Sequence, residues 1–165
     1  MLAMTRWFHY LCLSLLITVA AHAEPPELHA FVPGSYQQLA SQNAKQPWVL
    51  IVWSITCPSC IKDMTLISEL HKKYPALKLI LLAADDLSAT QQVQAILTKY
   101  GLSELENWVY ADDNTQKLSY EIDPNWFGEL PRTYFYTLAQ QRTGVSGVIK
   151  QADFETMFAK ITQAK

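Results

Sequence analysis

Two of the three cysteines in this 165-residue chain, Cys57 and Cys60, stand in a C-x-x-C arrangement. When one thiolate of such a pair attacks a foreign disulfide, the second can resolve the mixed disulfide that forms. The loop between them is so short that closing it removes little chain entropy, so the pair makes a poor structural cross-link. We therefore interpret it as a redox-active pair.

A zinc site is one alternative, because C-x-x-C pairs also bind zinc. Structural zinc sites need four ligands, usually with a second Cys or His pair. The third cysteine, Cys12, lies in an apolar N-terminal stretch, and His29 and His71 do not form a zinc-type pair. The sequence thus predicts no metal and no cofactor beyond the Cys57–Cys60 disulfide. An inert cysteine pair is the other alternative.

The flanking residues predict where the thiols lie. Residues 48–55 (WVLIVWSI) form a continuous apolar run, typical of a strand buried on both faces. Pro58 suits the first turn of a helix, and helical apolar spacing continues to Pro75. Cys57 then precedes a helix N-terminus, where backbone N–H groups and the helix dipole stabilise a thiolate. Cys57 is the expected nucleophile and Cys60 the resolving thiol.

The rest of the chain alternates between strand-like and helix-like segments. Further strands are expected at 77–84, 108–111, 132–137 and 142–146, and further helices at 36–44, 88–100, 115–121 and 153–161. This order predicts an α/β domain with a central mixed, mainly parallel sheet and helices on both faces. The late hairpin would add an antiparallel edge.

The N-terminus has the layout of a secretory signal peptide: Arg6, an apolar stretch, and the small-x-small site Ala21-His22-Ala23. An uncleaved anchor is the alternative, but the stretch is short for a membrane span. We expect cleavage after Ala23, which separates a signal peptide (1–23) from one domain (24–165). Export would place that domain in an oxidising compartment. With a formal net charge of -2 and no basic run, the chain has no nucleic-acid footprint.

The pattern Trp53-x-x-x-Cys57-x-x-Cys60 after a buried strand resembles the thioredoxin superfamily, in particular the TlpA-like periplasmic reductases. Their motif typically continues with E-x-P, and Asp63 and Thr65 stand at those two positions here. Residues 128–135 (GELPRTYF) are similar to the family's G-x-P-T-T-F-hydrophobic segment, which makes Pro131 the expected cis-proline. Over residues 48–161 the resemblance implies a thioredoxin-like fold.

Several supporting roles are expected beside the cysteines, each with a simpler alternative. Trp53 either shields the disulfide or is core packing. Asp63, one turn beyond Cys60, either relays that thiol's proton or is a solvated helix-start carboxylate. The loop 123–130 is longer than is usual in the family. We expect Leu130 to pair with an extended client backbone.

The two aromatic residues of that loop, Trp126 and Phe127, should flank the client with apolar surface. In the alternative they pack only on the body of the domain. Either way they belong to the segment that leads directly into Pro131.

The function expected is that of a periplasmic, monomeric thiol–disulfide oxidoreductase that reduces disulfides in protein clients. The resemblance implies a membrane thiol–disulfide protein as its electron donor. A disulfide-forming oxidant is one alternative, because a stabilised thiolate makes the couple more oxidising. Pro58 and Ser59 offer no charge for that purpose, which favours the reductase. A non-catalytic client-binding adaptor is the other alternative.

Overall fold

The structure, a computed structural model, describes residues 25–163. The expected signal peptide, its cleavage site after Ala23 and Cys12 lie outside the described residues. Among the helices that are described, none has the length and apolar character needed to span a membrane.

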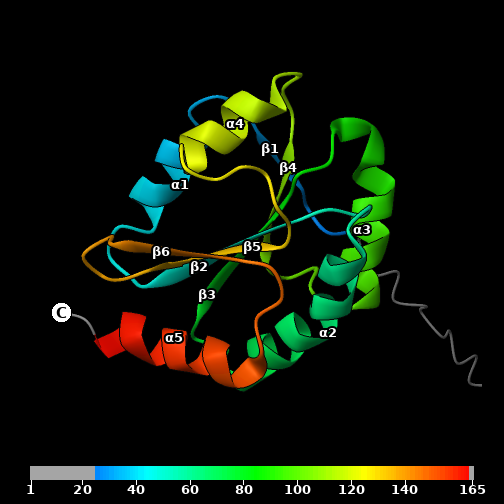
Figure 1. The fold of residues 1–165 in the computed structure, drawn as a ribbon. Helices are drawn as coiled ribbons and strands as arrows, with labels where there is room; N and C mark the ends of the chain where they lie inside the picture. Colours follow the sequence, from blue (N-terminus) through cyan, green and yellow to red (C-terminus); the bar gives the residue numbers. More distant parts are fainter. Residues whose placement is uncertain (1–24, 164–165) are drawn as a thin grey trace, which may run out of the picture.

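One six-stranded sheet forms the centre of the domain (Figure 1). Its strands are β1 (His29–Phe31), β2 (Trp48–Trp53), β3 (Lys78–Ala83), β4 (Glu106–Tyr110), β5 (Arg132–Tyr136) and β6 (Arg142–Ser146). The helices are α1 (Ser35–Gln42), α2 (Pro58–Lys73), α3 (Thr90–Lys99), α4 (Thr115–Ile122) and α5 (Gln151–Gln163), with a short 3₁₀ helix, η1 (Leu87–Ala89), before α3.

The strand order is β1-β4-β3-β2-β5-β6. The first four strands in that order are parallel, whereas β5 is antiparallel to β2, and β6 to β5. The sheet is therefore mixed rather than mainly parallel. The reason is that β5 begins at Arg132 opposite Val52, near the end of β2, and must run back toward Trp48.

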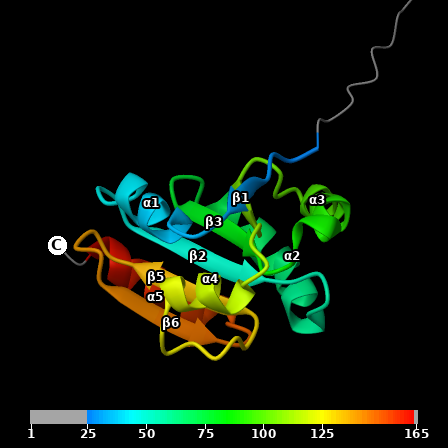
Figure 2. The same cartoon turned by 90° about the horizontal axis from the view of Figure 1, so that it is seen from above.

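Helices cover both faces of the sheet, as expected (Figure 2). Helices α2, α3 and α5 pack on one face over Val49, Ile51 and Trp53, and α1 and α4 pack on the other. All six residues of β2 are buried, so the apolar run at 48–55 does form a strand buried on both sides. The central strand is thus held by packing on both faces. Its end fixes the start of the segment that leads to Cys57.

Candidate functional site

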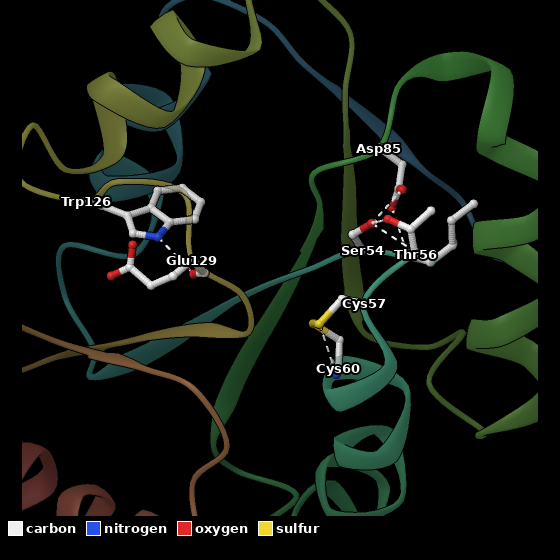
Figure 3. The surroundings of a disulfide bond; sticks show 8 residues. Ser54, Thr56, Cys57, Cys60, Asp85, Trp126 and Glu129 are labelled. Carbon is white, nitrogen blue, oxygen red and sulfur yellow. Dashed lines mark hydrogen bonds between the residues drawn. A yellow bond between two sulfur atoms is a disulfide. The ribbon is translucent and has the colours of Figure 1, made fainter.

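A disulfide joins Cys57 and Cys60 where β2 gives way to α2 (Figure 3). Cys57 is the N-cap of α2, and Pro58 is the helix's first residue, as the sequence predicts. The Cys60 backbone N–H donates to Cys57 Sγ at 3.1 Å. This sulfur therefore sits where the free N–H groups of a helix start favour a negative charge.

The two cysteines differ in accessibility. Cys57 is half-buried, whereas Cys60 is 1% exposed and belongs to the core under α2. An incoming disulfide can approach only the sulfur that solvent reaches. The geometry thus supports Cys57 as the attacking sulfur and Cys60 as the internal one.

The segment between β2 and Cys57 is held by a carboxylate from a neighbouring strand end. Asp85, just beyond β3, accepts hydrogen bonds from the Ser54 hydroxyl (2.8 Å) and the Ile55 N–H (3.0 Å). Sequence reasoning did not select Asp85. The available signal was its place at the carboxyl end of a buried strand expected to lie parallel to β2.

Trp53, Asp63 and Pro131 meet Cys60 around one narrow, mostly apolar cavity. The Leu130–Pro131 peptide bond is cis. Trp53 is buried in the core on the α2 face of the sheet. Three of the supporting residues expected from the sequence therefore lie around the same cavity as the buried cysteine, Cys60.

Asp63 is only partly buried, on the helix turn after Cys60. Burial raises the pKa of its carboxyl above the ordinary value of 3.8. Within residues 25–163 this carboxylate has neither a hydrogen bond nor an ion pair that would favour its charged form. A carboxyl that holds its proton more tightly, beside a resolving thiol, suits proton exchange with that thiol.

The loop 123–130 crosses the other side of the site. At its start, Asp123 pairs with Arg132 (3.1 Å) and Arg142 (2.9 Å). Near its end, Glu129 Oε1 accepts a hydrogen bond from the Ser146 hydroxyl. Both ends are thus fastened to the β5–β6 hairpin.

Trp126 and Phe127, which the sequence analysis treated as a pair, differ in exposure. The Trp126 indole N–H donates to the Glu129 carbonyl at 3.0 Å, and the ring meets Tyr134 edge-on, so the side chain is 7% exposed. Its burial favours the packing alternative for Trp126. Phe127, in contrast, projects from the loop and is 94% exposed.

A broad hollow lies between this loop, α4 and the segment before Cys57. It is lined by Ser54, Thr56, Ala84, Tyr110, Thr115, Gln116, Ser119, Tyr120, Trp126, Phe127, Gly128 and Leu130. None of these is Asp, Glu, Lys, Arg or His. The hollow offers hydroxyl groups and aromatic rings, and Thr56 places it directly beside Cys57.

Several solved structures share this fold. A secreted Mycobacterium tuberculosis disulfide oxidoreductase homologous to E. coli DsbE aligns with a TM-score of 0.60 at 21% identity, over 73% of this chain and 85% of that one. A thioredoxin-family thiol:disulfide interchange protein from Chlorobium tepidum aligns with 0.59 at 13% identity, over 74% and 83%. StoA from Bacillus subtilis aligns with 0.53 at 16% identity, over 69% and 83%.

The first of these neighbours is described as a disulfide oxidoreductase and the second as a thioredoxin-family thiol:disulfide interchange protein. The fold of the chain is thioredoxin-like, as the motif resemblance implied. No family model matches the chain, and no curated protein matches it in sequence.

Proposed function

We propose that this protein is a thiol–disulfide oxidoreductase whose redox couple is Cys57 and Cys60. The observation that carries the proposal is the disulfide at the start of α2, with the half-buried Cys57 at the helix N-terminus and the fully buried Cys60 behind it. A helix start activates a sulfur by favouring its thiolate. The arrangement supplies one accessible nucleophile and one internal resolving thiol.

In the proposed reaction, the Cys57 thiolate attacks one sulfur of a client disulfide, and the other client sulfur leaves as a thiolate. Cys60, after losing its proton, attacks Cys57 Sγ in the mixed disulfide. The Cys57–Cys60 disulfide forms and the second client thiolate leaves. Two electrons pass from the protein's dithiol to the client, and an external thiol donor must restore the pair.

We infer that the working direction is reduction of protein disulfides, with a membrane thiol–disulfide protein as electron donor. The dipeptide between the cysteines, Pro58-Ser59, adds no positive charge to stabilise the reduced pair. A couple with a less stabilised thiolate is more reducing. The uncharged hollow beside Cys57 has room for a protein segment and supports a protein client.

Insulin reduction by the purified full-length protein tests the activity, with Cys57→Ser as the inactive control. If the protein only binds clients without turnover, the unaltered protein and Cys57→Ser would reduce insulin at the same background rate. Titration against glutathione tests the direction. We expect a potential near the ≈ −270 mV of thioredoxin, while a value near the ≈ −120 mV of DsbA would assign an oxidant.

The proposed place of work is the cell envelope, with residues 1–23 removed after Ala23. The layout of the N-terminal residues supports export, and the M. tuberculosis neighbour is described as secreted. Fractionation with N-terminal sequencing tests this. A cytoplasmic protein that begins at Met1 would overturn it, and a membrane-bound one that begins at Met1 would show an uncleaved anchor.

A further inference from the structure

The carboxylate of Asp85 connects the end of β3 to the segment that carries Cys57 (Figure 3). Each carboxylate oxygen has a different partner. Oδ1 accepts from the Ser54 hydroxyl at 2.8 Å, and Oδ2 accepts from the Ile55 backbone N–H at 3.0 Å. The two bonds fix both a side chain and the backbone within three residues of Cys57.

From Ser54 the hydrogen bonds continue toward the cysteine. The Thr56 N–H donates to Ser54 Oγ at 3.1 Å, and the Cys57 N–H donates to the Ser54 carbonyl at 3.2 Å. Ser54 is 6% exposed, so water does not easily replace these partners. Consecutive backbone donors from Ile55 to Cys57 are therefore all directed onto Asp85 or Ser54.

The end of β3 is itself rigidly placed. The Ala84 N–H donates to the Trp53 carbonyl at 2.8 Å, which extends the parallel pairing of β2 with β3 by one bond. Asp85 follows immediately. The sheet therefore fixes the position of the Asp85 carboxylate, and the segment 54–56 takes the conformation that bonds to it.

We infer that Asp85 is a positioning residue for Cys57, an inference that rests on the proposed role of Cys57 as nucleophile. Through Ser54 and Ile55 it holds the backbone in the conformation that sets Cys57 at the N-cap of α2. There the sulfur lies 3.1 Å from the Cys60 N–H. Without this anchor the segment gains freedom, and the Cys57 thiolate loses part of the stabilisation that the helix start provides.

The chain offers a matched control in the next residue. Asp86 carries the same charge one position along, but it is exposed and accepts from the Ser88 N–H at 2.8 Å, away from the cysteine segment. Asp86→Asn removes a carboxylate from the same region and leaves the segment 54–56 bonded. Ser54→Ala does the opposite: it removes the hydroxyl that bonds Asp85 and the Thr56 N–H, and it changes no charge.

The test measures Cys57 alone, in full-length protein with Cys12→Ser and Cys60→Ser as background. The rate of iodoacetamide alkylation is followed against pH for Ser54→Ala, Asp85→Ala, Asp85→Asn and Asp86→Asn, with thermal melting of each. We expect Ser54→Ala and Asp85→Ala to slow alkylation at pH 7 by about threefold or more and to move the pH profile upward, since half a pKa unit is about threefold. Asp85→Asn keeps one acceptor oxygen, so its alkylation rate should lie between that of Asp85→Ala and that of the background protein. Asp86→Asn should be alkylated at the same rate as the background protein.

Two results would overturn the inference. If melting falls but the alkylation profile stays in place, Asp85 only anchors the fold. If Asp85→Asn and Asp85→Ala accelerate alkylation while Ser54→Ala changes nothing, the carboxylate acts by its charge alone. Alkylation needs no client, so a failure of insulin reduction would refute the proposed function without touching this measurement. If Asp85→Ala fails to fold, the alkylation profiles of Ser54→Ala and Asp85→Asn still test the inference.

Discussion

Trp126 and Phe127 are neighbours in the chain, yet Trp126 is 7% exposed and Phe127 is 94% exposed. The buried ring packs edge-on against Tyr134 and bonds the Glu129 carbonyl, so it shapes the loop. The exposed Phe127 ring makes no comparable packing contact with the described residues and lines the hollow beside Cys57. The two substitutions should therefore have different effects.

Phe127→Ala should slow reduction of a protein client severalfold while leaving the rate with a small aromatic disulfide and the melting temperature unchanged. A small disulfide does not reach a surface that a protein client covers. Leu138→Ala is a suitable control, because this exposed side chain lies past the opposite end of β5. Equal slowing of both substrates, or an equal effect of Leu138→Ala, would show that Phe127 is not a specificity element.

Trp126→Ala should instead destabilise the fold by about 3–5 kcal/mol, the usual cost of truncating a buried aromatic side chain. Denaturant unfolding of this variant beside Phe127→Ala measures the difference. If the two variants unfold at the same denaturant concentration, the packing seen around Trp126 contributes little to stability.

Cys60→Ser should accumulate mixed disulfides with clients, whereas Cys57→Ser should trap few. The reason is accessibility: Cys57 is half-buried and Cys60 is 1% exposed. Non-reducing electrophoresis after mixing each variant with a disulfide-containing client gives the comparison. Comparable trapping by both would mean that the buried sulfur becomes exposed during exchange, contrary to the assignment.

Local pattern was enough to predict the core of the site. The apolar run at 48–55, Cys57 and Pro58 define a strand-to-helix junction within about a dozen residues, and the structure forms it as expected. Short-range signals of this kind depend little on the rest of the fold.

The features that sequence reasoning missed all depend on tertiary contacts rather than on a local pattern. Strand β1 has three residues and exists because it pairs with β4. Trp126 is buried against Tyr134 of β5. Asp85, just beyond β3, accepts a hydrogen bond from Ser54 at the end of the neighbouring strand β2. The direction of β5 follows from where the preceding loop returns to the sheet. None of these partners can be identified from one sequence by periodicity.

Asp123→Ala should destabilise the fold by about 3–5 kcal/mol, because it leaves two arginines without their shared partner in a largely buried site. Asp123 is 5% exposed and holds Arg132 and Arg142 at once. The more accessible Lys73–Glu155 pair, at 2.7 Å, is the control, and Glu155→Ala should lower stability far less, because solvent screens this pair. Similar losses in urea unfolding for the two variants would show that burial adds nothing to the Asp123 network.

Asp63→Asn should stabilise the protein slightly at pH 7 and lose that advantage in acid. Burial raises the pKa of Asp63 in the folded state above 3.8, so the folded protein holds this proton more tightly than the unfolded chain. The corresponding stability is present below the ordinary pKa and is lost as pH rises through the folded value. Asn is neutral throughout, so the difference in melting temperature should shrink from pH 7 toward pH 4. A difference that does not change with pH would exclude the titration of Asp63 as its cause.

The same substitution tests the proposed proton relay. If Asp63 takes the Cys60 proton, Asp63→Asn should slow the resolving attack on a preformed Cys57 mixed disulfide by at least about tenfold at pH 7 and change its pH dependence. The alkylation profile of Cys57 should stay in place, because that sulfur is stabilised by the helix start and not by Asp63. Glu69→Gln, which removes an exposed carboxylate from the same helix, supplies the control. If Asp63→Asn and Glu69→Gln resolve the mixed disulfide as the unaltered protein does at every pH, Asp63 has no part in the mechanism and is a surface carboxylate of α2.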